Sequence, residues 1–260
     1  MYTFHIDETG RSGNTKFFYI GGLVAHEDQF IQAVKGVGDI RDQYGYEDTD
    51  LFKFSTNTRP HKMDRHKWTS SKSDALRLID QLGIKFVATY ISHEVARPLE
   101  RAQGTIWNLQ NLMRHYARLY LRDTPGAVCM DRIDEKWGND EIAKIAQRRI
   151  EYKDSYIGIP EIIHFAFTDA RFSKFNSLVD IALGSFQLCC ENAFKEPTYH
   201  REQTTQTLLE FLAPIFAKDT ETGYIKGAGA YPQPSTIKAP NIKKEYDELS
   251  SYIVRHMPRR

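Results

Sequence analysis

The alternation of strand-like and helix-like segments is the feature that most constrains the fold of this chain. From Ser71 onward, apolar runs of strand length alternate with amphipathic helical patterns. The runs lie at 84–91, 126–131 and 162–167, and the longest helical patterns at 99–122 and 175–194. Alternation of this kind builds a mixed sheet with helices on its faces, so we expect one α/β domain.

The N-terminal segment is expected to add a hairpin to this sheet. Apolar and polar residues alternate over Tyr2–Asp7, which is the period-two pattern of a half-buried strand. A turn-rich stretch at 9–14 separates it from Lys16–Val24, the expected returning strand. A helix is expected over 26–44, and Leu51–Phe54 is expected to form a short third strand.

The remaining elements divide the chain near residue 217. Ser71 or Ser73 is expected to cap a helix that Gly83 ends, because serine satisfies first-turn amides and glycine accepts a left-handed exit. Further expected elements are a helix from Asn139 to about Tyr152, a helix at 204–216, an extended arm at 218–243, a short helix at 245–255 and a basic tail at 255–260. We therefore assign the main domain to 1–217 and a C-terminal helical extension and arm to 218–260.

Composition gives few global clues to a partner. The 35 Lys and Arg residues against 34 Asp and Glu residues leave a formal net charge of +1, so any basic surface must be local. No apolar run approaches the ~20 residues that span a bilayer, and no basic segment followed by an apolar stretch opens the chain. The three cysteines form no zinc-binding pattern. We expect a reduced, cytoplasmic protein with no membrane partner.

Three aspartates occupy positions that suggest a shared site. Asp7 closes the first strand, Asp131 closes the strand at 126–131, and Asp180 lies in a helix that is apolar over most of its circumference. Two adjacent strand ends with a helix packed over them would bring these carboxylates together. Oxygen ligands suit Mg²⁺ or Mn²⁺, and a pair of such ions activates water for phosphodiester cleavage.

Each aspartate also has a simpler interpretation. An acid at a strand end is most often a solvated turn residue, and an acid within a helix is often an ion-pair partner or caps a neighbouring loop. Glu8 depends on the local backbone. If the strand continues through it, Glu8 points to the face opposite Asp7, and only an immediate turn brings it into the site.

Four motifs in this order resemble domain-of-unknown-function family 3800 (DUF 3800). The first is His5-Ile6-Asp7-Glu8-Thr9-Gly10 followed by a strand containing Gly21-Gly22. The second is the Lys-aromatic segment at 52–55, the third is the aliphatic strand that ends in Asp131, and the fourth runs from 167 to Asp180. The resemblance covers about residues 2–195.

The resemblance implies a ribonuclease-H-like fold and a metal-dependent nuclease. Carried over by position, Asp7, Asp131 and Asp180 would be metal ligands, with Glu8 as a further candidate catalytic residue. Asp169 would be an outer ligand or the cap of the following helix. Lys53 would contact a phosphate of the nucleic acid or neutralise the acidic cluster.

A basic segment at Arg59–Lys72 supplies candidate nucleic-acid contacts. A flexible loop here, beside an acidic metal site, would bind phosphates through its cations while an aromatic ring stacks on a base. The candidates are Arg59, Lys62, Arg65, Lys67 and Trp68. A solvated loop without a partner explains the same composition.

Two functions follow from these observations. The first is a Mg²⁺- or Mn²⁺-dependent nuclease that hydrolyses phosphodiester bonds of nucleic acid at a two-metal carboxylate site. The second is a catalytically silent module that binds nucleic acid or protein, as one component of a defence or mobile-element complex. The arm at 218–243 is either a contact in a homo-oligomer or partner complex, or an ordered segment lying on its own domain.

Overall fold

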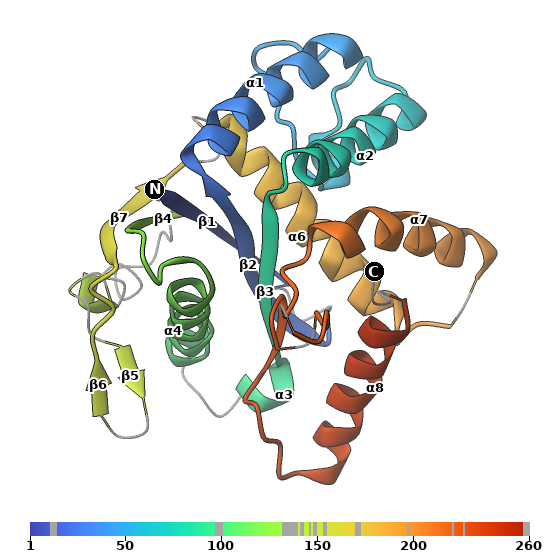
Figure 1. Ribbon diagram of the computed structural model, residues 1–260. Helices are drawn as coiled ribbons and strands as arrows, with labels where there is room; N and C mark the ends of the chain where they lie inside the picture. The colour runs from blue at the N-terminus through green and yellow to red at the C-terminus, as the bar shows by residue number, and fades with distance from the viewer. Residues whose placement is uncertain are drawn as a thin grey trace.

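The architecture is a sheet with helices on both faces (Figure 1). The computed structural model describes residues 1–10, 15–96, 101–131, 140, 143–145, 147, 150–152, 155–169, 173–196, 198–219, 221–225 and 227–256. Its strands are β1 (Tyr2–Thr9), β2 (Phe17–His26), β3 (Lys85–Ser92), β4 (Gly126–Asp131), β5 (Ile150–Tyr152), β6 (Ser155–Ile157), β7 (Ile162–Thr168) and β8 (Ala230–Gln233). Its α-helices are α1 (Glu27–Tyr44), α2 (Arg65–Gln81), α3 (His93–Ala96), α4 (Arg101–Tyr120), α6 (Lys174–Asn192), α7 (Tyr199–Ile215) and α8 (Pro240–His256).

The main sheet has six strands in the order β7-β4-β1-β2-β3-β8. Strands β1, β2 and β3 form an antiparallel meander. On one side, β4 runs parallel to β1 and β7 runs parallel to β4; on the other, β8 runs parallel to β3. Strands β5 and β6 form a separate two-stranded sheet. The chain therefore has the α/β class that the alternation predicts.

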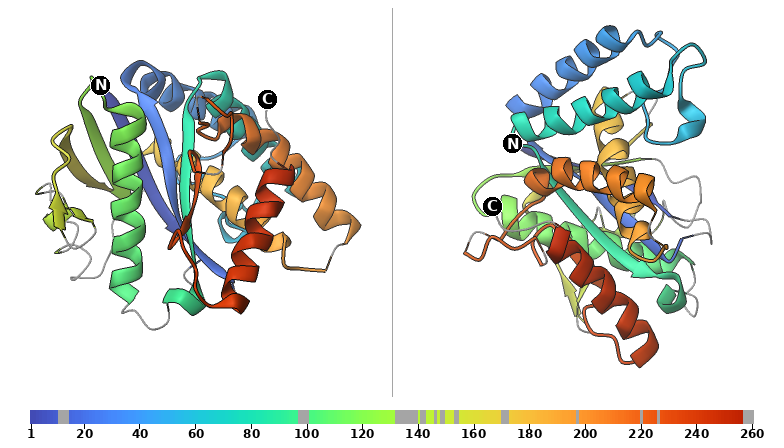
Figure 2. Two further views of the ribbon diagram at one scale, coloured as in Figure 1. Left: turned by 60° about the horizontal axis from the view of Figure 1, so that its bottom comes forward. Right: turned by 90° about the vertical axis from the view of Figure 1, so that its right-hand side faces the viewer.

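The two faces of the sheet carry separate apolar cores. Helix α4 covers one face, while α1, α2, α6 and α7 lie on the other (Figures 1 and 2). Phe4 and Ile6 of β1 belong to the core beneath α4. His5 and Asp7 point to the opposite face, where the ring of His5 contacts Phe175 of α6. The period-two pattern of the first strand is thus confirmed, and it directs Asp7 toward α6.

Most expected strands and helices are present, with ends shifted by a few residues, but the expected strand at Leu51–Phe54 is wrong. These residues form no ladder with another strand. The Phe54 amide instead donates to Asp180, and the Phe54 carbonyl accepts from Lys72. Side chains of α6 and α2 satisfy the polar backbone groups that a neighbouring strand would otherwise bind.

Two helix expectations also need correction. Helix α2 begins at Arg65, six residues before Ser71, because the Asp64 carboxylate accepts from the Lys67 amide at 2.9 Å and caps the helix. The helix expected to reach Tyr152 ends earlier, since 150–152 are a strand. Its expected cap, Asn139, lies outside the described residues.

The C-terminal segment packs on the domain that precedes it. Strand β8 extends the sheet beside β3, and α8 buries Tyr246, Leu249 and Ile253 in the core that α6 and α7 share. The arm expected at 218–243 therefore lies on its own domain over its described residues. No helix in the described part of the chain is long and apolar enough to cross a membrane.

Candidate metal and nucleic-acid site

Asp7 and Asp131 lie side by side on neighbouring parallel strands. The register pairs Ile6 of β1 with Met130 of β4, so the next residue in each strand is an aspartate. Met130 belongs to the core beneath α4, as Ile6 does, and Asp131 therefore shares the α6 face with Asp7. The prediction that Asp7 and Asp131 lie on adjacent strands is confirmed, but β1 continues to Thr9, so Asp7 does not close its strand as the sequence suggested.

The start of α6 brings a third carboxylate to this point. Ser173 caps the helix by accepting from the Asn176 amide at 3.3 Å. Asn176 Oδ1 accepts from His5 Nδ1 at 3.2 Å, and Asn176 Nδ2 donates to Thr168 Oγ1 at 2.6 Å. Four residues of a helix advance ~6 Å along its axis, and two residues of a strand advance ~7 Å. Asp180, four residues after Asn176, therefore lies over Asp7, two residues after His5.

The electrostatics of the site show that the three carboxylates are neighbours. The pKa of Asp7 is raised to about 7, chiefly because burial disfavours the charged form. The negative charges of Asp180 and Asp131 raise it further, whereas the Glu8 amide and the Lys53 ammonium lower it. The Glu8 amide donates to Asp7 Oδ1 at 2.7 Å. The site therefore concentrates negative charge that its own cations only partly offset.

Asp180 is held from the 51–54 segment. Its Oδ2 accepts from the Phe54 amide at 2.6 Å, and its Oδ1 lies 3.9 Å from the Lys53 ammonium. Burial raises the pKa of Asp180, and the nearby Asp131 adds to the rise, while Phe54, Lys53 and Lys72 oppose it. Lys53 thus offsets part of the negative charge of the cluster, in line with one of the two roles considered from the sequence; its contact with a phosphate stays a prediction.

The donor set suits a hard divalent cation in its chemistry, because all three side chains offer carboxylate oxygens. Their mutual repulsion, seen at Asp7, is what a cation would relieve. Among the described residues, however, no group of three or more His, Cys, Asp or Glu side chains is close enough to hold a metal ion as it stands. The three aspartates thus have the right ligand chemistry and are neighbours, but their side chains do not form a complete coordination shell.

The structure does not bring Glu8 to this point. Strand β1 continues through Thr9, and Glu8 pairs with Ile20 in the ladder, so its side chain points to the face opposite Asp7. The prediction that Glu8 belongs to the catalytic site is therefore wrong. Asp169 follows β7, but the cap of α6 is Ser173, so the helix-capping role considered for Asp169 is also wrong.

The basic segment at 59–72 is ordered and partly helical. Arg59, Lys62, Arg65 and Lys67 are exposed, as a nucleic-acid surface requires, and Lys62 forms an exposed ion pair with Glu47 at 3.0 Å. Arg65 and Lys67 lie in the first turn of α2. The part of the segment from Arg65 onward is therefore a basic helical surface and not a loop.

Trp68 does not have the position that the sequence suggests. Its side chain is 4% exposed and lies in the core beneath α1 and α2, so it offers no ring for a base to stack on. Trp68 stands at the start of a helical apolar pattern with Ala75, Leu76 and Ile79. Two features of the sequence could have predicted that Trp68 is buried: Asp64 as the helix cap, and this apolar spacing.

Lys72 is the residue at this site that sequence reasoning missed. It is 7% exposed, and its Nζ lies 3.1 Å from the centre of the Trp68 ring and donates to the Phe54 carbonyl at 3.1 Å. Burial lowers its pKa to about 7, with Asp180 opposing the shift and Arg65 adding to it. Its spacing of four residues from Trp68 and Leu76 marks the buried face of α2.

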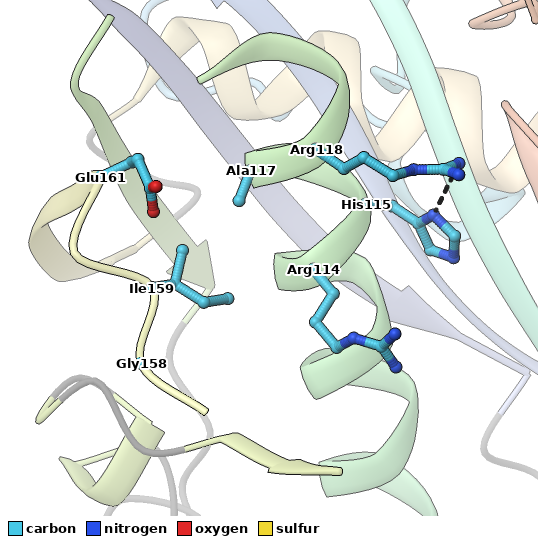
Figure 3. Close-up of a pocket in the computed structure, with 7 residues that line it drawn as sticks. All are labelled: Arg114, His115, Ala117, Arg118, Gly158, Ile159 and Glu161. Carbon is cyan, nitrogen blue, oxygen red and sulfur yellow. Dashed lines mark hydrogen bonds between the residues drawn. The ribbon is translucent and has the colours of Figure 1, made fainter. Parts of the chain in front are cut away.

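A pocket of about 280 Å³ lies away from these carboxylates, between α4 and the segment before β7 (Figure 3). Its lining residues are Arg114, His115, Ala117, Arg118, Gly158, Ile159 and Glu161. In Figure 3 the Arg118 and His115 side chains point away from the Ile159 side of the pocket and toward each other. The pocket includes none of the residues predicted to carry function.

Comparison of the chain with models of known protein families and with curated proteins gave no match.

Proposed function

We propose that this protein is a metal-dependent nuclease with a ribonuclease-H-like fold, and that Asp7, Asp131 and Asp180 form its metal site. The observation that carries the proposal is the meeting of these carboxylates from β1, β4 and α6, with the pKa of Asp7 raised to about 7 partly by the other two. A fold that gathers half-buried acids whose charge is only partly offset by cations loses stability, which is typical of sites built for a ligand.

The strand arrangement supports the ribonuclease-H-like part of this proposal. An antiparallel meander, β1 to β3, is extended on the β1 side by the parallel strands β4 and β7, with helices on both faces. The candidate ligands then fall at the carboxyl ends of the two central parallel strands, β1 and β4. Such strand ends are where open α/β sheets bind ligands.

In this proposal each part of the site has a separate task. A bound Mg²⁺ or Mn²⁺ would lower the pKa of a water molecule and offset charge on the phosphate. The three aspartates hold the cation, and Lys53 holds Asp180 through its charge. Arg65 lies near enough to affect the pKa of Lys72, which Asp180 also affects, so the basic start of α2 adjoins the carboxylates. Nucleic acid would follow this basic surface.

The test is cleavage of single-stranded and double-stranded DNA, RNA and a hybrid, each with Mn²⁺ and with a chelator. We expect chelator-sensitive cleavage in the wild-type protein and its loss in Asp131→Asn. Asp247→Asn is the matched control, because Asp247 is an exposed acid of α8 paired with Lys243. Full activity in Asp131→Asn would refute the site.

The second function, a catalytically silent binding module, is favoured by one observation. The described residues contain no group of three metal-binding side chains arranged around one point. Thermal unfolding with and without millimolar Mn²⁺ separates the two functions, because a ligand that binds the folded state raises its stability. A rise in Tm that Asp7→Asn abolishes supports the metal site, and an unchanged Tm supports the silent module.

A further inference from the structure

The Lys72 ammonium is buried between two aromatic rings beside the carboxylate site. Its Nζ lies 3.1 Å from the centre of the Trp68 ring and 4.6 Å from the centre of the Phe54 ring. Aromatic faces attract a cation because of their negative quadrupole. Within the described residues, its hydrogen-bond acceptor is the Phe54 carbonyl, 3.1 Å away. The ammonium is therefore fixed on three sides.

The Phe54 residue connects this ammonium to Asp180. Its carbonyl accepts from Lys72 and its amide donates to Asp180 Oδ2 at 2.6 Å. Its ring lies so close to Gly184, one turn beyond Asp180 on α6, that a Cβ at Gly184 would come within 2.5 Å of two ring carbons. Backbone and ring of Phe54 are thus clamped between α2 and α6.

Packing alone does not explain a lysine at position 72. Burying an ammonium is unfavourable, and its remaining N–H groups face rings in place of oxygen acceptors. A methionine would occupy a similar volume on this face of α2 without that cost. The gain from the charge must therefore lie in what it contacts, which is the Phe54 carbonyl and, beyond it, the Asp180 carboxylate.

We propose that Lys72 is a positioning residue: it fixes the Phe54 peptide group, and that group fixes the Asp180 carboxylate at the edge of the sheet. This inference rests on the proposed function only in so far as Asp180 acts as a metal ligand. The connection itself runs through two hydrogen bonds that exist without a metal ion. Lys53 completes the arrangement from solvent, where its side chain is 28% exposed.

The first test measures the Phe54 amide directly, by hydrogen exchange of the metal-free protein in NMR spectra. In Lys72→Met we expect this amide to exchange about tenfold faster or more, because its peptide group loses the anchor at its carbonyl. In Lys72→Arg, which keeps a cation and a donor, we expect exchange within about threefold of wild type. Amides of β2 report whether each variant is folded.

Lys85→Met is the matched control, because Lys85 is a partly buried lysine that also donates to a backbone carbonyl, that of Pro214, at 3.3 Å. It should leave Phe54 exchange unchanged. If Lys72→Met fails to fold, Lys72→Leu provides the same comparison, because leucine also has no donor for the Phe54 carbonyl. Unchanged Phe54 exchange in a folded variant that lacks the donor at position 72 would overturn the positioning role.

The second test separates this inference from the proposed function. On any nucleic acid that the wild type cleaves, Lys72→Met should lower kcat by about tenfold or more with KM within about twofold, since Lys72 positions a ligand of the metal and does not touch substrate. A fall confined to KM would contradict the proposal. If the wild type cleaves nothing but Phe54 exchange responds as expected, the nuclease proposal fails while the positioning role stands.

Discussion

At the scale of single residues, the three aspartates were predictable because strand periodicity and strand ends fix where a side chain points. Asp7 lies near the end of a strand with a clear apolar face and Asp131 closes another, so their meeting on the opposite face follows from the register. Glu8 and Trp68 were not predictable in the same way. The environment of Glu8 depends on how far β1 continues, and that of Trp68 on where α2 begins, which the Asp64 cap sets.

Asp7 gives a pH-dependent stability that can be measured without any substrate. Its pKa rises from 3.8 to about 7 on folding, so the folded protein binds the proton more tightly than the unfolded chain. The protonation of Asp7 therefore stabilises the folded protein; this contribution is fully present below pH 3.8 and is lost as the pH rises through 7. With chelator present, Asp7→Asn should therefore raise the free energy of unfolding at pH 8 by roughly 2–4 kcal/mol and leave it nearly unchanged near pH 4.

The measurement is the difference in unfolding free energy between wild type and variant, from urea titrations across this pH range. Taking the difference removes the opposing contribution of His5, whose pKa is lowered to about 4 by burial and which both proteins share. A difference that does not change with pH would show that Asp7 is not buried among negative charges.

At the scale of elements, α6 aligns its polar side chains with those of β1. Asn176 meets His5 at 3.2 Å, Asp180 lies over Asp7, and Gln187 accepts from Thr9 at 2.6 Å. These contacts follow one face of the helix and alternate residues of the strand. The helix register therefore places Asp180, and contacts on both sides of Asp180 fix that register.

Asn176 carries the first of these contacts. Replacing it by alanine should cost about 1–3 kcal/mol of unfolding free energy, because His5 is left buried without this partner and Thr168 loses a donor. Asn111→Ala is the control, since the described hydrogen bonds of the Asn111 side chain, with Trp107 and Arg114, stay within α4. Chemical denaturation of both variants makes the comparison, and equal stabilities would contradict the anchoring role.

The 51–54 segment shows where the prediction of elements from sequence ends. The short run Leu51-Phe52-Lys53-Phe54 is rich in the apolar and aromatic residues of strands, yet the backbone there binds side chains of α2 and α6. A local sequence pattern shows which side chains are apolar, but it does not show which groups form hydrogen bonds with the backbone amides and carbonyls. Those groups, Lys72 and Asp180, are distant in sequence and join the segment only in the folded protein.

At the scale of the whole molecule, the C-terminal segment is fastened to the sheet by Tyr246. Its hydroxyl accepts from the Ser92 amide at 2.7 Å and donates to the Gln233 carbonyl at 2.5 Å, joining the end of β3 to the end of β8. The sequence predicted the arm but left its contacts open. The pairing of β8 with β3 depends on a parallel register that short, glycine- and proline-rich segments do not encode locally.

Tyr246→Phe tests this attachment. It should lower the free energy of unfolding by about 1–3 kcal/mol, because a buried amide and carbonyl lose their shared partner. Tyr252→Phe on the same helix is the control, since no described hydrogen bond involves its hydroxyl. Thermal or urea unfolding of the two variants suffices, and an equal effect would refute the attachment.

The basic surface at the start of α2 predicts salt-dependent binding of nucleic acid. Arg65→Glu with Lys67→Glu should weaken binding of single-stranded DNA or RNA at least tenfold at low salt, and the difference should shrink as salt rises. Lys238→Glu with Lys244→Glu, at two exposed positions distant in sequence from α2, is the charge-matched control. Fluorescence anisotropy provides the readout, and a salt-independent effect would indicate misfolding instead of lost phosphate contacts.

The position of β8 also has a consequence for how the protein is made. Strand β3 is synthesised before the segments that bind its outer edge, Phe216 with Ala217 and then β8, which follow only after α4, β4, β7, α6 and α7. Until they arrive, the nascent chain carries an apolar strand with open amides and carbonyls, a template for pairing with another chain. A chain that terminates before Phe216 is therefore expected to aggregate unless it is degraded.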